Sequence, residues 1–134
     1  MMRELRLFLT AVQFLTRLPV PSLKDFAPEW ITASARYYPL VGQIVGAISG
    51  LVLVYAGKAW GGAIPAVLAV LAGILVTGAF HEDGLGDTAD GLGGGRDKAT
   101  RLAIMKDSRI GTYAALALVI TVALRPTPPS PAWA

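Results

Sequence analysis

Two long uncharged runs dominate the pattern of hydrophobic and polar positions along this chain of 134 residues. Residues 40–57 and residues 63–80 contain no Asp, Glu, Lys or Arg, and the short sequence KAWGG separates them. As a helix, each run would be about 27 Å long, against a membrane hydrocarbon core of about 30 Å. The pattern therefore predicts a transmembrane hairpin over residues 40–80, with a tight turn at its centre.

Small residues recur on both predicted helices at the spacing of one helical turn. Gly42, Gly46 and Gly50 are four residues apart and lie beside Ser49, while the second run carries Ala69 and Gly73. Small residues allow helix backbones to approach closely in a membrane. We therefore expect close packing along these two strips.

The segments on either side of the hairpin are amphipathic or short. Residues 1–18 place apolar side chains at helical spacing with arginines at the edges, and Gln13 and Arg17 interrupt the apolar run. This pattern favours an interfacial helix over a signal peptide, and Arg17 is most simply an interfacial cation. Three prolines predict a loop over residues 19–29, and Tyr113–Leu124 reads as the start of a third membrane helix.

Composition agrees with a membrane protein. The chain is 54% hydrophobic and 16% charged, whereas ordinary soluble domains are about 25% charged. The absence of cysteine excludes disulfides and thiolate metal sites, and a net charge of +3 is too small to indicate a nucleic-acid partner. The expected fold class is therefore an all-α, polytopic integral membrane protein.

Six of the nine acidic residues fall in one window, residues 80–111. Asp83, Asp87 and Asp90 have the spacing i, i+4, i+7, which would stack them on one helix face. Two carboxylates about 6 Å apart repel by roughly 3 kcal/mol at an effective dielectric constant of about 20, so a divalent cation would relieve the cluster. Oxygen-only ligands suit Mg²⁺, Mn²⁺ or Ca²⁺, and few protein ligands with room for water and phosphate suit Mg²⁺ best, so we predict a metal site at Glu82, Asp83, Asp87 and Asp90.

Two features leave the form of this window open. Six interleaved glycines weaken a helix, so a turn-rich metal loop competes with it, and a solvated acidic loop is the third alternative. Basic residues follow at once, with a short helix predicted over residues 98–107, capped by Asp97 and ending near Gly111. These cations could hold phosphate or form an anionic-lipid patch.

Four segments resemble the cobalamin synthase family, also called adenosylcobinamide-GDP ribazoletransferases. They are FHEDGLGDTADGLGGGRD at 80–97, IMKDSRIGTY at 104–113, FLTRLPVP at 14–21 and YYPLVGQIVGAISG at 37–50. Gly86 stands where the family pattern leads us to expect Ala. The resemblance covers residues 1–124 and only the N-terminal half of the family, so we expect a chain truncated or frameshifted near residue 124, with an unrelated or disordered Pro-rich tail at 125–134.

The resemblance implies a magnesium-dependent transferase. It would join adenosylcobinamide-GDP and alpha-ribazole, or its 5'-phosphate, with release of GMP, in the last step of cobalamin nucleotide loop assembly. The implied catalytic residues are Asp83, Asp87 and Asp90. Together with Glu82 they are expected to hold one or two magnesium ions, with the alternative that one of the four is the general base. The implied substrate-binding residues are Arg96, Lys106, Asp107 and Arg109. We expect no activity from the half-length chain unless it assembles with itself or with a second half, and assembly with other enzymes of the pathway is left open.

Two alternatives and an orientation complete the sequence-based interpretation. The alternatives are a non-catalytic membrane protein, such as a cation-transport fragment or an assembly subunit, and a CDP-alcohol phosphotransferase-like enzyme, whose aspartate spacing fits poorly. Residues 1–39 and 81–109 each hold five Lys or Arg, whereas the hairpin turn holds only Lys58. The positive-inside rule then predicts a multi-pass protein of the cytoplasmic (inner) membrane with the acidic segment 81–109 facing the cytoplasm.

Overall fold

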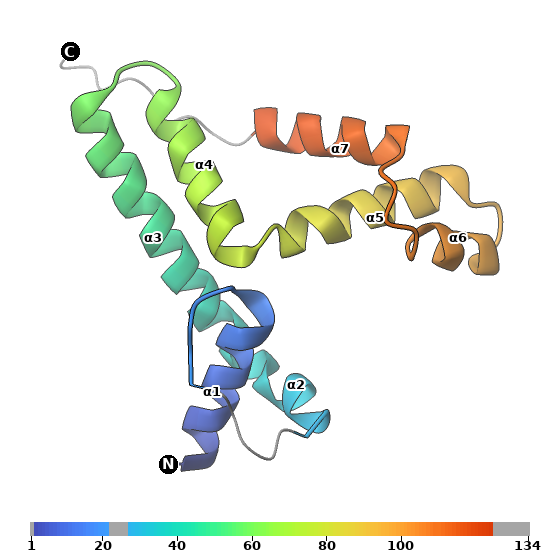
Figure 1. Ribbon diagram of the computed structural model, residues 1–134, viewed down its shortest axis with the longest axis horizontal. Helices are drawn as coiled ribbons and strands as arrows, with labels where there is room; N and C mark the ends of the chain where they lie inside the picture. The colour runs from blue at the N-terminus through green and yellow to red at the C-terminus, as the bar shows by residue number, and fades with distance from the viewer. Residues whose placement is uncertain (1, 22–26, 125–134) are drawn as a thin grey trace. The chain divides into compact units, whose positions relative to one another are not determined.

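The computed structural model describes residues 2–21 and 27–124, and all regular structure within these ranges is helical (Figure 1). The expected all-α fold class is thus confirmed for this part of the chain. The chain divides into two compact units, Met1–Gly78 and Ala79–Ala134, which we describe separately. The predictions for the tail at residues 125–134 lie outside the described residues.

The first unit contains an N-terminal helix, a short helical connection and a helical hairpin. Its elements are α1 (Met2–Leu15), α2 (Glu29–Ser34), the 3-10 turn η1 (Ala35–Tyr37), α3 (Tyr38–Ala59) and α4 (Ile64–Thr77). The buried core joins Ala11, Val12 and Leu15 of α1 to Val41 in the first turn of α3. The predicted N-terminal helix is confirmed, and its apolar face packs on the base of α3.

The predicted hairpin is confirmed as a helix pair, α3 beside α4 (Figure 1). One point of close approach is Gly73, where an added Cβ would lie 3.1 Å from Ser49 Oγ. In contrast, a Cβ added at Gly42, Gly46 or Gly50 would meet nothing within 4 Å. Close packing therefore occurs at Ser49 and not along the rest of the predicted strip on α3.

The prediction that residues 63–80 form one continuous helix is wrong. α4 ends at Thr77 because Gly78 takes a left-handed conformation, with φ 67°, and Ala79 follows with φ 62°. Gly78 is required for a second reason, since an added Cβ would collide with the side chain of Arg17, whose backbone N–H donates to the Val76 carbonyl at 2.7 Å. Fourteen residues of helix span about 21 Å, less than a hydrocarbon core.

Among the described residues, one helical stretch, Glu29–Ala59, has the length and apolar composition needed to cross a membrane. The number of possible membrane spans rises to two if α4 and the helix that follows it, Phe80–Gly94, are counted together as one broken span. Thr112–Ala123 is a shorter apolar helix. These helices are consistent with a membrane protein, and the predicted number of crossings stays a prediction.

The second unit consists of α5 (Phe80–Gly94), α6 (Lys98–Ile104) and α7 (Thr112–Ala123), with α5 packed against both of the others. The part of the acidic window that carries Glu82, Asp83, Asp87 and Asp90 is therefore helical, and the turn-rich alternative for it is wrong. The predicted cap is confirmed, because the Asp97 carboxylate accepts from the Thr100 backbone N–H at 2.9 Å. The prediction that Gly111 lies at the end of α6 is wrong: α6 ends at Ile104, and Gly111 is the N-cap of α7.

Two glycines of the second unit predict opposite responses to alanine. A Cβ at Gly86 would make an ordinary contact of 3.4 Å with the Ala114 Cβ, so Gly86→Ala should stabilise α5 by up to about 1 kcal/mol. A Cβ at Gly95 would lie 2.7 Å from the Gly91 carbonyl oxygen and 2.9 Å from the Arg101 Cα, so Gly95→Ala should destabilise the unit. Thermal unfolding of the two variants in detergent measures the difference, and equal midpoints would contradict this packing.

Candidate active site

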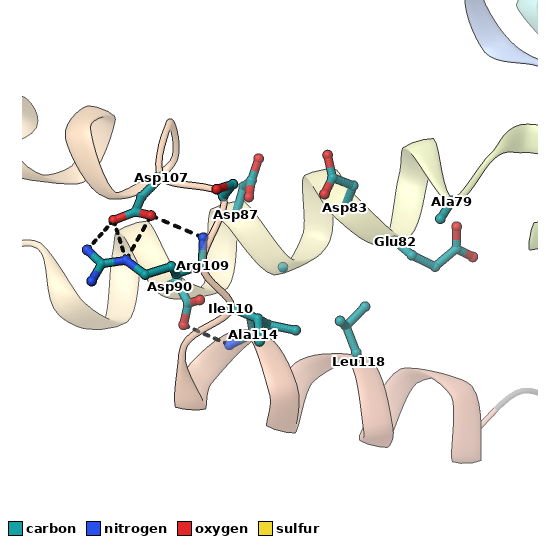
Figure 2. A pocket seen from close by; sticks show the side chains of 12 residues that line it. Ala79, Glu82, Asp83, Asp87, Asp90, Asp107, Arg109, Ile110, Ala114 and Leu118 are labelled. Carbon is teal, nitrogen blue, oxygen red and sulfur yellow. Dashed lines mark hydrogen bonds and ion pairs between the residues drawn. The ribbon is translucent and has the colours of Figure 1, made fainter.

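The predicted acidic residues and one predicted basic residue, Arg109, line a cavity of about 330 Å³ in the second unit (Figure 2). Its charged lining residues are Glu82, Asp83, Asp87 and Asp90 from α5 and Asp107 and Arg109 from the connection between α6 and α7. Apolar side chains of α7, including Leu118, complete the lining. Acidic positions separated by up to 25 residues in sequence thus share one cavity with a guanidinium.

The helical backbone of α5 explains the placement of the acids. Asp83 and Asp87 are one turn apart and project from the same side of α5 in Figure 2. Buried Gly86 lies between them and faces Ala114 and Leu118 of α7. The i, i+4 relationship read from the sequence is therefore present in three dimensions for this pair.

Asp90 has a defined structural role. Its Oδ2 accepts from the backbone N–H of Gly111 at 2.6 Å, and its Oδ1 accepts from that of Ala114 at 2.9 Å. These amides belong to the first turn of α7, where backbone N–H groups have no partner within the helix. A negative charge there is also favoured by the helix dipole. Asp90 therefore anchors the start of α7 to α5.

Asp107 and Arg109 form a bidentate pair in the lining of the cavity. Arg109 Nε donates to Asp107 Oδ1 at 3.0 Å and Arg109 Nη2 donates to Oδ2 at 2.6 Å (Figure 2). Arg109 nevertheless remains 87% exposed, so its guanidinium keeps access to a ligand. The hydrogen bonds from Arg109 lower the pKa of the Asp107 carboxyl from its usual 3.8 to about 2. Asp107 orients Arg109 and stays ionised at neutral pH.

This pKa shift predicts the pH range over which the pair exists. Because the folded pKa of Asp107 lies below the unfolded value, the pair contributes stability above pH 3.8 and loses it as the pH falls through about 2. Carbon-13 NMR of the Asp107 side chain in micelles should show its titration near 2. In Arg109→Gln the titration should return toward 3.8, and an unchanged titration would place the cause elsewhere.

Two of the predicted substrate-binding residues lie apart from the cavity. Arg96 and Lys106 are exposed and are not among the residues that line it. The lining also contains Ser108 and Ile110, which were not among the predicted site residues. Both residues lie in the segment DSRIG, which connects the predicted capped helix to the Gly before the next apolar run. That position was the feature of the sequence from which their place in the site could have been inferred.

The carboxylates suit a hard cation by their chemistry. All the charged acceptors of the cavity are carboxylate oxygens, as Mg²⁺ prefers. Among the described residues, no three His, Cys, Asp or Glu side chains converge closely enough to hold an ion by themselves. Mg²⁺ commonly takes only one or two carboxylates and completes its shell with water and phosphate oxygens, so a magnesium site would not need three converging acids.

Within residues 2–21 and 27–124, all regular structure is helical, one helical stretch is long and apolar enough to cross a membrane, and carboxylates and an arginine line a small cavity. The sequence model of the cobalamin-5-phosphate synthase family matches residues 7–127. The chain belongs to this family.

Three relatives, each named adenosylcobinamide-GDP ribazoletransferase, illustrate the similarity. The Leptothrix cholodnii protein is 50% identical over 125 residues, covering 93% of this chain and 47% of its own length. The Shewanella amazonensis protein is 47% identical over 92% of this chain and 47% of its own. The Xanthobacter autotrophicus protein is 52% identical over 86% of this chain and 45% of its own. The chain thus spans about half the length of these relatives, and no solved structure matches it.

Proposed function

We propose that this chain supplies the phosphate-reacting part of an adenosylcobinamide-GDP ribazoletransferase. The observation that carries the proposal is the cavity in which carboxylates of α5 face the Asp107–Arg109 pair, within a chain that matches this family over residues 7–127. The substrates are adenosylcobinamide-GDP and alpha-ribazole or its 5'-phosphate, and the products are the cobalamin, or its 5'-phosphate, and GMP.

In the proposed reaction the ribazole hydroxyl oxygen forms a bond to the phosphorus atom next to cobinamide. The phosphoanhydride bond between that phosphorus and GMP breaks, and GMP leaves with the bridging oxygen. The hydroxyl proton passes to a carboxylate of the cavity, for which Glu82, Asp83 and Asp87 are the available groups. Charge neutralisation dominates the catalysis of such transfers, since no covalent intermediate is needed.

Asp83 and Asp87 are the proposed magnesium ligands, with Glu82 beside them, because both oxygens of Asp90 already accept hydrogen bonds from α7. When bound, Mg²⁺ supplies charge neutralisation to the diphosphate. Arg109, held by Asp107, would contact a phosphate oxygen bound in the cavity. Arg96 and Lys106 lie outside this cavity and would contact a more distant part of the nucleotide.

The size of the cavity limits what this half of the enzyme binds. About 330 Å³ is near the lower end of ligand pockets, which run from roughly 300 to 1,000 Å³. That volume holds a diphosphate with its metal and water but not a corrin ring. The proposal therefore assigns the reacting phosphates to this cavity and leaves the corrinoid and the base to surfaces beyond it.

A chimera tests this proposal. The N-terminal segment of the Leptothrix cholodnii relative is replaced by the matching segment of this chain, and membranes are supplied with both substrates and Mg²⁺. We expect release of GMP with formation of a cobalamin product. A chimera that inserts normally in the membrane but forms no GMP would overturn the proposed function.

We also propose a cytoplasmic-membrane location with residues 81–109 facing the cytoplasm, on the basis of the ten basic residues that flank the hairpin. Single cysteines at Trp60→Cys and Gly94→Cys should be labelled by an impermeant maleimide from opposite faces of the membrane. Labelling from the same face would exclude this orientation.

A further inference from the structure

A second hollow, of about 360 Å³, lies in the first unit between α1 and α2. Arg3, Arg6 and Leu7 of α1 and Trp30 of α2 line it. The guanidinium carbon of Arg6 is 6.0 Å from the centre of the Trp30 ring, which is within the range of a cation–π contact. Two guanidinium groups and an indole therefore surround a space large enough for a small anionic group.

The charge of these arginines is not balanced by α1 itself. Glu4 is the one acidic residue of α1, and its Oε2 accepts from the Tyr37 hydroxyl at 2.8 Å and pairs with Arg36 Nη1 at 3.6 Å. Within residues 2–21 and 27–124, the ion pairs are Arg36–Glu4 and Arg109–Asp107. Arg3 and Arg6 thus leave a net positive charge at this hollow, which predicts an anionic ligand.

The hollow lies at one end of the helix that is long enough to cross a membrane. The core of the first unit joins α1 to Val41, in the first turn of α3, with Tyr37 and Tyr38 packed against it. Tyr and Trp are enriched at membrane interfaces, where lipid headgroups lie. If α3 crosses the membrane, Arg3, Arg6 and Trp30 lie at the depth of lipid phosphates.

We propose that this hollow binds the headgroup phosphate of an anionic lipid such as phosphatidylglycerol. The guanidinium groups of Arg3 and Arg6 would bind phosphate oxygens, and Trp30 forms a wall of the same hollow. The inference rests on the proposed membrane location and is independent of the proposed transferase activity.

The test uses Trp30 as the reporter, in the full chain carrying Trp60→Phe and Trp133→Phe. The protein in a zwitterionic detergent is titrated with short-chain phosphatidylglycerol, with phosphatidylcholine of the same acyl length, and with inorganic phosphate. We expect a saturable change in Trp30 emission, with phosphatidylglycerol binding roughly ten-fold or more tightly than phosphatidylcholine, since each basic residue near an anionic lipid contributes about 1 kcal/mol. Native mass spectrometry counts the lipid that is retained.

Matched variants separate a site from general charge attraction. Arg3→Gln with Arg6→Gln should remove the preference for phosphatidylglycerol, whereas Lys58→Gln with Lys98→Gln removes the same charge from exposed positions and should leave it intact. Helicity by circular dichroism shows that both fold. The proposal would be overturned if both variants lost the preference for phosphatidylglycerol to the same extent, or if the unsubstituted protein bound the two lipids with equal affinity. Inorganic phosphate binding as tightly as phosphatidylglycerol would instead assign the site to soluble phosphates.

Discussion

In the chimera described above, Asp87→Asn is expected to lower the rate of GMP release by roughly 10²- to 10³-fold, the usual effect of removing one group that stabilises transition-state charge. Asp87 lies one turn from Asp83 on α5 and lines the cavity beside the Asp107–Arg109 pair. The substitution keeps the shape of the side chain and removes its charge. Magnesium affinity, measured by calorimetry, should fall in parallel.

The control for Asp87→Asn is Glu29→Gln, which removes an exposed acid at the start of α2 in the first unit. This variant should release GMP at the parental rate. Membrane insertion and helicity should be unchanged in both variants, so that a lost rate reflects chemistry. Near-parental turnover in Asp87→Asn would reduce the acidic face of α5 to a structural role and remove the basis for the magnesium assignment.

The local pattern of the sequence predicted most elements of this fold. Uncharged runs marked α3 and α4, and Asp97 before a basic segment marked the start of α6, because both signals act over a few neighbouring residues. The carboxylate spacing predicted that Asp83 and Asp87 share one side of a helix, as they do. Such features depend on periodicity and capping, which the sequence displays directly.

Features that depend on contacts between distant residues could not be predicted. Composition could not show that α4 stops at Thr77, since Gly78 and Ala79 are apolar in sequence and break the helix only through their left-handed backbone. The contact of Arg17 with Gly78 joins residues far apart in the chain. Likewise, the spacing of the acids indicated Asp90 as a third metal ligand. The sequence could not show that both of its carboxylate oxygens accept hydrogen bonds from backbone N–H groups 21 and 24 residues downstream.

Asp90→Asn therefore tests the anchoring of α7 to α5, whereas Asp87→Asn tests the proposed magnesium site. An asparagine has one acceptor oxygen, whereas Asp90 uses both oxygens for the backbone N–H groups of Gly111 and Ala114. One of these N–H groups would then face the amide NH₂ and lose its partner. Leaving a partly buried donor unsatisfied costs about 1–3 kcal/mol. We expect a lower thermal midpoint of the second unit and faster hydrogen exchange at residues 111 and 114.

The comparison of the two variants distinguishes an anchor from a metal ligand. If Asp90 anchors α7, then Asp90→Asn should retain the magnesium affinity measured by calorimetry while hydrogen exchange at the start of α7 accelerates. Asp87→Asn should show the reverse, because Asp87 projects from α5 beside Asp83 and the anchoring hydrogen bonds belong to Asp90. Loss of magnesium binding in Asp90→Asn with unchanged exchange at residues 111 and 114 would instead make Asp90 a ligand, as the i, i+4, i+7 spacing first indicated.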